Sequence, residues 1–310
     1  MDLHLDVSRR LAPRSALTRD ENFGWCVDSA DGDLLALDDR LRDIARFRLP
    51  EDALGKHGIS PDRQTATVSA RSRVVVVDRA GSTVWEVPHA SWGGGDSQRG
   101  SCWFSADGRF VWAHVPTDDG PDKWLLLGAK SGTTAGRVRL SCYSAGSDVI
   151  RHPDGNHVGL SVGEGQDGSE TYFGWVQGGS PAVDRLDDRS RVLVAFSPDG
   201  DRFLTTAHSS GPLQLHRSSD HAVVAALEPE AAFDGDDAFD FFGGFVGPEL
   251  VLFTSVESDD VFVASVPDLG DVQRLQVPMR RAGDPLFVIP GGFLVSDPAT
   301  GETTVWRLTG

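Results

Sequence analysis

Short apolar runs alternate with tight polar turns along most of the chain. Residues 192–204 give the clearest example, because an apolar run ending at Phe196 leads into Ser-Pro-Asp-Gly and a second apolar run follows. The Asp-Gly pair supplies the positive backbone dihedrals that a tight hairpin turn requires, and β-branched and aromatic residues fit a pleated, buried surface. This segment is therefore predicted to be a β-hairpin.

Turns of the same kind recur at nearly constant spacing. They lie at residues 29–32, 60–63, 105–108, 152–155, 197–200, 246–248 and 290–292. After a first interval of 31 residues, they follow one another at 44 to 47 residues. A period of this length with four short strands per repeat is typical of a β-propeller. The pattern predicts an all-β, seven-bladed β-propeller, with six blades as the alternative count.

The first and last repeats are short. The first interval lacks about one strand, and only residues 293–296 and 303–308 have strand character after the last turn. An open propeller would expose unpaired strand edges, so we expect residues 3–7 to form a strand that joins the last blade and closes the ring. Residues 303–308 also resemble the expected outer strand at residues 82–87, which leaves open which strand of the short repeats is missing.

At this point the chain resembles the WD40-like propeller superfamily, in particular bacterial repeats marked by Ser-Pro-Asp-Gly between the first two strands. The resemblance covers roughly residues 20–310, and its best motif is residues 196–204. The chain lacks the Gly-His pair before the first strand and the Trp-Asp pair at the end of the third strand that the fuller WD40 pattern has. The resemblance implies a propeller fold and says little about function.

Composition agrees with one all-β domain spanning residues 1–310. The chain has 35 Gly and 17 Pro, and no segment shows sustained helical periodicity with caps. Its formal net charge of −17 argues against a nucleic-acid binder, because phosphate contacts need clustered Lys and Arg. A partner with a basic surface is favoured instead.

The N-terminal residues have neither a basic segment nor an apolar stretch of the kind that marks a secretory signal, and no apolar run is long enough to span a bilayer. A cytoplasmic location without membrane contact is the resulting expectation. Cys26, Cys102 and Cys142 form no CxxC pair, so neither a disulfide framework nor a zinc site built from cysteines is expected. Cys26 and Cys102 fall in one column of the aligned repeats and are predicted to be buried packing residues.

Acidic residues concentrate in loops that a propeller places on one face. These are the loops from strand two to strand three and the loops between blades. A rim of one charge sign would steer a basic protein, a peptide or a cation toward it, whereas solvated loops of an acidic protein can also be acidic without any such role. The candidate binding carboxylates are Asp118, Asp119, Glu164, Asp167, Asp234, Asp236, Asp237, Asp259 and Asp260.

Two other groups of residues fall on the same predicted rim. Arg280 and Arg281 interrupt the acidic sequence and could orient a partner. Trp92, in a Gly-rich loop, could form an aromatic recognition patch with Tyr143, Phe239 and Phe241, although the alternation of the two Phe residues favours the core for both. Residues 234–237 offer oxygen ligands without the spacing of a calcium loop, so no cofactor is expected, with calcium as the alternative.

Histidines are the candidates for catalysis. His89, His114 and His208 lie near strand ends on the predicted rim, and His152 replaces the Ser of the fourth turn. In a propeller enzyme such residues would gather at the central opening, where a His could act as a general acid or base with a carboxylate such as Asp118. No Gly-x-Ser-x-Gly, His-Glu-x-x-His or paired-Cys motif supports a reaction class.

The sequence thus favours a non-enzymatic, monomeric interaction scaffold that binds a basic protein or peptide on an acidic face. Fold-level analogy contributes to this hypothesis. The alternative is an enzyme, a lyase, isomerase or hydrolase, acting on a small molecule in the central funnel. A third hypothesis is a sensor of a cation or small ligand.

Overall fold

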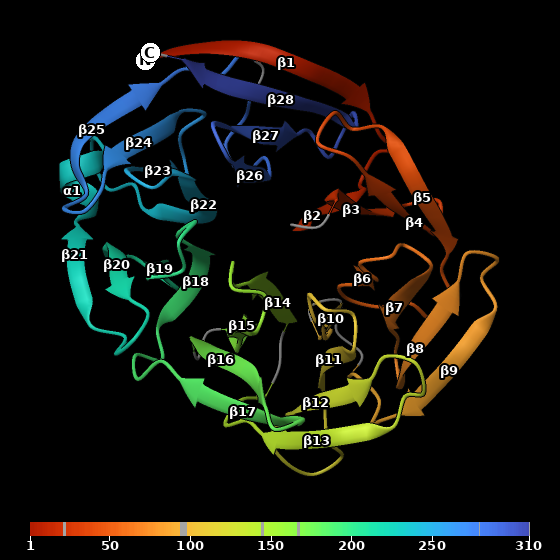
Figure 1. Cartoon of the computed structure of the whole chain (residues 1–310). Helices are drawn as coiled ribbons and strands as arrows, with labels where there is room; N and C mark the ends of the chain where they lie inside the picture. The colour runs from red at the N-terminus through yellow and green to blue at the C-terminus, as the bar shows by residue number, and fades with distance from the viewer. Residues whose placement is uncertain (21–22, 94–97, 144–145, 166–167, 279, 310) are drawn as a thin grey trace. The chain divides into compact units, whose positions relative to one another are not determined.

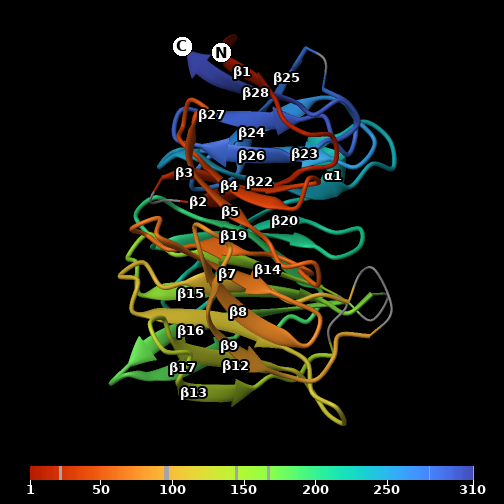
Figure 2. The same ribbon diagram turned by 90° about the vertical axis from the view of Figure 1, so that its right-hand side faces the viewer.

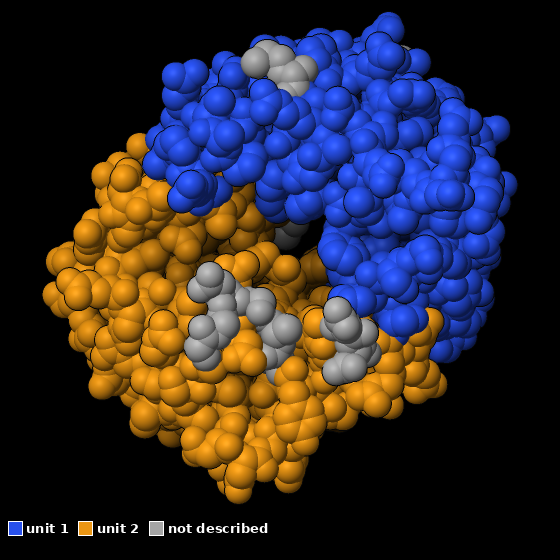
Figure 3. All heavy atoms as spheres, turned by 180° about the vertical axis from the view of Figure 1, so that it is seen from behind, with its two compact units in different colours: residues 1–15, 190–310 blue, residues 16–189 orange. Residues whose placement is uncertain are grey.

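The structure is a computed structural model that describes residues 1–20, 23–93, 98–143, 146–165, 168–278 and 280–309. Within these residues the chain forms two compact units, shown in blue and orange in Figure 3. Unit 1 comprises residues 1–15 and 190–310, and unit 2 comprises residues 16–189. The prediction of one domain over the whole chain stays a prediction.

Unit 2 contains four antiparallel sheets of four strands each, which we number as blades 1 to 4 in chain order (Figure 1). Blade 1 consists of β2 (Ala16–Asp20), β3 (Gly24–Ser29), β4 (Asp33–Leu37) and β5 (Asp43–Arg48). Blade 2 consists of β6 (Gly58–Ile59), β7 (Thr65–Ser69), β8 (Arg73–Asp78) and β9 (Thr83–Pro88). Blade 3 consists of β10 (Cys102–Phe104), β11 (Phe110–Val115), β12 (Lys123–Gly128) and β13 (Thr134–Arg139). Blade 4 consists of β14 (Gly146–Arg151), β15 (His157–Gly163), β16 (Ser169–Gln177) and β17 (Ser180–Arg185).

Unit 1 contains the other three sheets. Blade 5 consists of β18 (Arg191–Phe196), β19 (Arg202–Ala207), β20 (Leu213–Arg217) and β21 (Val223–Leu227). A four-residue helix, α1 (Pro229–Ala232), precedes blade 6, which consists of β22 (Phe239–Gly247), β23 (Leu250–Ser255), β24 (Val261–Ser265) and β25 (Gly270–Leu275). Blade 7 consists of β26 (Leu286–Ile289), β27 (Gly292–Ser296), β28 (Glu302–Thr309) and the N-terminal strand β1 (Asp2–Arg10). The predicted all-β, seven-bladed β-propeller is confirmed.

The N-terminal strand completes the last blade, as predicted. β1 runs antiparallel to β28 in eight register pairs, from Asp2 opposite Thr309 to Arg10 opposite Glu302. The two chain ends consequently lie side by side, as Figures 1 and 2 both show. β28 is the third strand of its blade, so its likeness to the outer strand β9 reflects similar side-chain patterning and does not mark an equivalent position.

Six of the seven turns join the first two strands of a blade, but the first one does not. The turn at Asp31 and Gly32 joins β3 to β4, the second and third strands of blade 1, which explains the short first interval. An Asp-Gly pair stabilises any tight hairpin, so the sequence could not distinguish the two places. In blade 2, Arg63 takes the place of the Gly and adopts its positive φ of 58°.

The Ser of the turn organises the backbone around it. Ser60, Ser105 and Ser197 each accept a hydrogen bond at 3.0 Å through their hydroxyl oxygen from the backbone N–H five residues further on. The same hydroxyl contacts the carboxylate two residues on, at 2.5 to 2.7 Å. His152 replaces this Ser in blade 4.

Apolar side chains between neighbouring blades form the core of each unit. Cys26, Cys102 and Cys142 are buried without disulfides, each in a different apolar cluster. The predicted packing role of Cys26 and Cys102 is confirmed, although Cys26 belongs to a second strand and is not equivalent to Cys102. Burial raises the pKa of Cys102 and of Cys142 to about 12, so these thiols are poor nucleophiles at neutral pH.

Each blade has two distinct ends. The connection from strand two to strand three and the connections to the neighbouring blades lie at one end, which we call the loop end; the other two turns lie at the turn end. This follows from the antiparallel order of the strands. The loop ends contain the acidic segments that the sequence singled out.

Removal of β1 tests its contribution to stability. Deleting residues 1–10 exposes the edge of β28 and removes Leu3, which packs against the cluster containing Phe293 and Trp306. Since each intramolecular hydrogen bond contributes about 1 kcal/mol net, we expect a loss of several kcal/mol and a Tm lower by at least about 5 °C, measured by thermal unfolding.

A matched pair of substitutions on β1 provides the control. Leu3→Ala should destabilise the protein by about 1 kcal/mol, whereas Leu5→Ala should have little effect because the Leu5 side chain is exposed. Equal effects of the two substitutions, or an unchanged Tm after the deletion, would contradict a closing role for β1.

Candidate functional site

The loop ends of blades 5 to 7 in unit 1 carry the largest group of predicted binding carboxylates. Asp234 and Asp236 are exposed in the segment between β21 and β22, and Asp259 is exposed between β23 and β24. Glu257, which is not among the predicted binding residues, is also exposed in the β23–β24 segment. Asp237 is half-buried. We call these five residues the acidic loop surface.

Hydrogen bonds hold these loops in fixed positions. Asp237 accepts the backbone N–H of Ala238 at 2.8 Å and that of Glu257 at 3.2 Å, so it joins two loops. Asp259 accepts the N–H of Ala282 at 2.6 Å and joins the second loop to the segment before β26. The side chains of Asp234 and Asp236 remain exposed. The surface is thus organised before any partner binds.

Asp260 and Arg280 were predicted to lie on the exposed rim, but both are buried. Asp260 is 7% exposed and pairs with Arg274, and Arg280 is 4% exposed. Nη1 of Arg280 donates to the carbonyls of Ser258 and Asp260, both at 3.1 Å, so this buried side chain holds the β23–β24 loop in place. Burial lowers the pKa of Arg280, although nearby carboxylates oppose that shift. Arg281 is exposed, as expected.

Two apolar side chains are exposed at the same end of blade 6. Phe241 is 48% exposed and stacks on His208 of blade 5, with ring centroids 6.2 Å apart. The expectation that it lies in the core is wrong, because the irregular pairing of β22 around it breaks the strand alternation; Phe239 is buried as expected. Val256 is 52% exposed, and its N–H donates to Ala238 beside the acidic loop surface.

In unit 2 the predicted binding residues are fewer, and among those described the contact given is between Tyr143 and Glu164. Asp118 and Asp119 are exposed in the β11–β12 loop, and Tyr143 is 63% exposed. Glu164 accepts the backbone N–H of Tyr143 at 2.9 Å. Asp167 lies outside the described residues.

Trp92 is buried, contrary to the expectation of an exposed recognition residue. Its indole is 3% exposed and packs between His89 and His114, at ring-centroid distances of 6.3 and 5.5 Å. The hydrogen-bond partner of His114 is the buried Asp122, at 3.0 Å from Nε2, and not Asp118. His114 therefore belongs to a buried pair, and Trp92 shields it from solvent.

The other two candidate histidines lie elsewhere. His152 is in the β14–β15 turn at the turn end of blade 4, where its Nδ1 lies 3.0 Å from Asp154, whose carboxylate also contacts His157. His208 stacks on Phe241 in unit 1. Among the described residues, only His89 and His114 of these four approach a common side chain.

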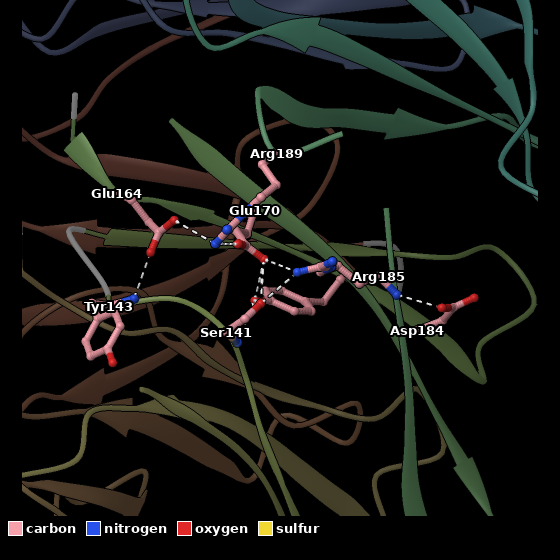
Figure 4. Close-up of polar contacts among 8 residues, drawn as sticks. Ser141, Tyr143, Glu164, Glu170, Asp184, Arg185 and Arg189 are labelled. Carbon is pink, nitrogen blue, oxygen red and sulfur yellow. Dashed lines mark hydrogen bonds and ion pairs between the residues drawn. The ribbon is translucent and has the colours of Figure 1, made fainter. Parts of the chain in front are cut away.

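A polar cluster that the sequence did not reveal lies between blades 3 and 4 (Figure 4). The Glu170 carboxylate is fully buried and accepts hydrogen bonds from the hydroxyls of Tyr172, at 2.7 Å, and Ser141, at 2.9 Å. Arg189 pairs with the same carboxylate, and Nη1 of Arg185 donates to the Ser141 hydroxyl at 3.0 Å. Glu170 and Tyr172 lie two residues apart on β16, whereas Ser141 follows β13, Arg185 ends β17 and Arg189 follows β17. No local motif connects all five residues.

The cluster is not arranged for nucleophilic catalysis. Burial acts to raise the pKa of Glu170, but the hydrogen bonds from Tyr172 and Ser141 and the Arg189 guanidinium outweigh it and hold the pKa below its usual range. A carboxylate so stabilised is a weak base and does not activate the serine. Ser141 and Tyr172 line an open groove of about 410 Å³ together with Arg185.

A second buried histidine, His57, lies beside a carboxylate in unit 2. Burial lowers the pKa of His57 to about 4, and its Nδ1 accepts the N–H of Ser69 at 3.3 Å, so the ring is neutral at pH 7 with its proton on Nε2. That nitrogen lies 3.5 Å from Asp28, whose pKa burial raises to about 6, an effect that Arg99 partly opposes.

Comparison with solved structures agrees with the architecture. The β-propeller domain of Cps50 (Swd1) from Myceliophteria thermophila superposes with a TM-score of 0.62 at 11% sequence identity, covering 99% of this chain and 100% of that one. The chain is a seven-bladed β-propeller. Identity at this level shows the fold alone, so membership of the bacterial Ser-Pro-Asp-Gly repeats stays a prediction. No family model and no curated protein matches the chain.

The one helix in the described part of the chain, α1, is four residues long. It has neither the length nor the apolar character needed to cross a bilayer.

The raised pKa of Asp28 predicts a pH-dependent effect on stability. The folded state binds this proton more tightly than the unfolded state, so ionised Asp28 opposes folding at pH 7, and the penalty falls as the pH drops through about 6. Asp28→Asn should be more stable than the wild type at pH 7, by up to about 1 kcal/mol because the side chain is 37% exposed, and its advantage should shrink by pH 5. Urea unfolding at both pH values measures this, with Asp31→Asn as an exposed control in the same blade. A larger advantage at pH 5 than at pH 7 would contradict the assignment.

Proposed function

We propose that the protein is a non-catalytic interaction scaffold that binds a protein or peptide partner with basic and apolar side chains. The binding surface is the acidic loop surface together with the exposed Phe241 and Val256 beside it. The observation that carries this proposal is the combination of exposed apolar side chains and exposed carboxylates at the loop end of blade 6.

Each component of this surface has a physical role in binding. Large aromatic side chains supply most of the energy in many interfaces when they become buried, which suits Phe241. Carboxylates of one sign attract a basic partner and reject an acidic one. Because Asp237 and Asp259 already hold the loops together, binding loses little free energy to loop ordering.

The fold and charge support the remaining parts of the proposal. A β-propeller is consistent with an interaction scaffold, although a fold alone does not specify a function. The net charge of −17 disfavours nucleic acid as the partner. We propose further that the protein acts as a monomer in the cytoplasm and away from membranes.

Neutralising the exposed carboxylates tests the electrostatic part. The triple variant Asp234→Asn, Asp236→Asn, Glu257→Gln should bind a fluorescent twelve-residue peptide containing Lys, Arg and Trp roughly tenfold more weakly than the wild type in fluorescence anisotropy. Its affinity should also depend less on salt concentration, because fewer charges are screened.

The matched control removes charge from the opposite end of the same blade. Glu249→Gln with Asp271→Asn neutralises two exposed carboxylates at the turn end of blade 6 and should leave binding unchanged. If the control and the triple variant weaken the peptide equally, the effect is one of overall charge and the acidic loop surface is not the site. An acidic peptide of the same length that binds as tightly would also overturn the proposal.

Truncating the aromatic side chain tests the apolar part. Phe241→Ala should weaken the same peptide by about tenfold or more, because an aromatic side chain buried at the centre of an interface typically contributes at least about 1.4 kcal/mol. Val224→Ala removes an exposed apolar side chain from β21 and should have no effect. Unchanged affinity of Phe241→Ala, with thermal unfolding confirming that it folds, would remove Phe241 from the binding surface.

A further inference from the structure

Three potential metal ligands meet at the loop end of blade 3. His114 is near the end of β11, Asp122 directly precedes β12, and Cys142 follows β13. Because consecutive strands are antiparallel, these three positions share one end of the sheet. The N–H of Asp122 donates to the carbonyl of Cys142 at 3.0 Å, which fixes two of the residues side by side.

The ligand atoms of these residues form a compact group. The imidazole nitrogen, carboxylate oxygen and thiol sulfur all lie within 4.8 Å of one another. The residues are buried, with exposed fractions of 1%, 4% and 0% for His114, Asp122 and Cys142. Trp92 packs against the His114 ring and covers it.

His114 also has an unused ring nitrogen. Nε2 lies 3.0 Å from the Asp122 carboxylate, whereas Nδ1 has no hydrogen-bond partner within the part of the chain that the structure describes. Because Nε2 is the nitrogen that faces the Asp122 carboxylate, it is the ring atom available to a metal ion shared with that carboxylate. Nδ1 stays outside this donor set.

The chemistry of the donor set selects the metal. Ca²⁺ and Mg²⁺ prefer oxygen ligands only, whereas Zn²⁺ accepts nitrogen, oxygen and sulfur together. A thiolate and a carboxylate also balance the two positive charges of Zn²⁺, so the occupied site is neutral. Charge balance is important here because an uncompensated charge in a buried position carries a large free-energy penalty.

We propose that His114, Asp122 and Cys142 bind one Zn²⁺ ion. Two light-atom ligands of tetrahedral zinc lie about 3.4 Å apart, so the observed 3.0 Å between His114 and Asp122 requires only a small adjustment. Binding forms a bond between zinc and the Cys142 sulfur, releases the thiol proton to the solvent and joins the ends of three strands. A water molecule completes the four ligands that zinc takes in proteins.

Metal analysis of the tag-free chain of residues 1–310 tests this site. After purification in zinc-containing buffer and dialysis against metal-free buffer, mass spectrometry should find one zinc ion per chain. Zinc-depleted protein given Co²⁺ should show the near-ultraviolet absorption of a thiolate-to-cobalt charge transfer together with the visible bands of tetrahedral cobalt. If the wild type retains no zinc and gives no such spectrum, the proposal is overturned without recourse to any variant.

Variants then assign the ligands. Cys142→Ser should lose the charge-transfer absorption, and Asp122→Asn should bind zinc at least tenfold more weakly. Cys102→Ser, which alters a thiol equally buried in a different core cluster, should keep one zinc ion and the full spectrum. A charge-transfer band that survives in Cys142→Ser, or that disappears in Cys102→Ser while the protein remains folded, would show that the metal is bound elsewhere.

Discussion

The structure depends on burying the faces of small sheets that cannot bury themselves. A four-stranded antiparallel sheet has two faces and gains stability only when apolar side chains on them leave water. Within each unit, neighbouring sheets bury one another's apolar faces. One example is the cluster in which Cys102 and Val111 pack with Val76 of the preceding blade. Each blade therefore needs four strands and a neighbour, which is why the chain returns its N-terminal strand to the last blade. β1 and β28 are far apart in sequence, yet their pairing gives blade 7 the same number of strands as the others.

A regular scaffold leaves the loops free to differ, and the carboxylates show how differently they are used. Asp237 and Asp259 hold loops together through backbone N–H groups, and Asp260 is buried against Arg274. Only the outer members of the same acidic segments, such as Asp234 and Asp236, stay exposed. Acidic sequence by itself thus describes two kinds of residue, those that build the surface and those that a partner would meet.

Blade 3 and its boundary with blade 4 hold two groups of buried polar side chains. Glu170 is kept ionised by hydroxyl groups and arginine, in an arrangement suited to stability and recognition and unsuited to proton transfer. The neighbouring group of His114, Asp122 and Cys142 has a different character, because its three donors are a nitrogen, an oxygen and a sulfur atom. The same fold therefore places a satisfied polar network beside a set of side chains that fits a metal ion.

The sequence by itself determined the class of the fold, the number of blades, most strand positions and the closing strand. These properties follow from alternation, turn chemistry and spacing, which are local or periodic. It misplaced the turn at Asp31 and Gly32, since that pair fits any tight hairpin. Only the tertiary structure decided which of the candidate side chains are exposed and which residues contact one another. Phe241 is exposed because β22 pairs irregularly, Trp92 is buried because two histidine rings enclose it, and His114 meets Asp122 and Cys142 because three antiparallel strands end together. Such contacts join residues that no sequence period relates, so only the packed chain reveals them.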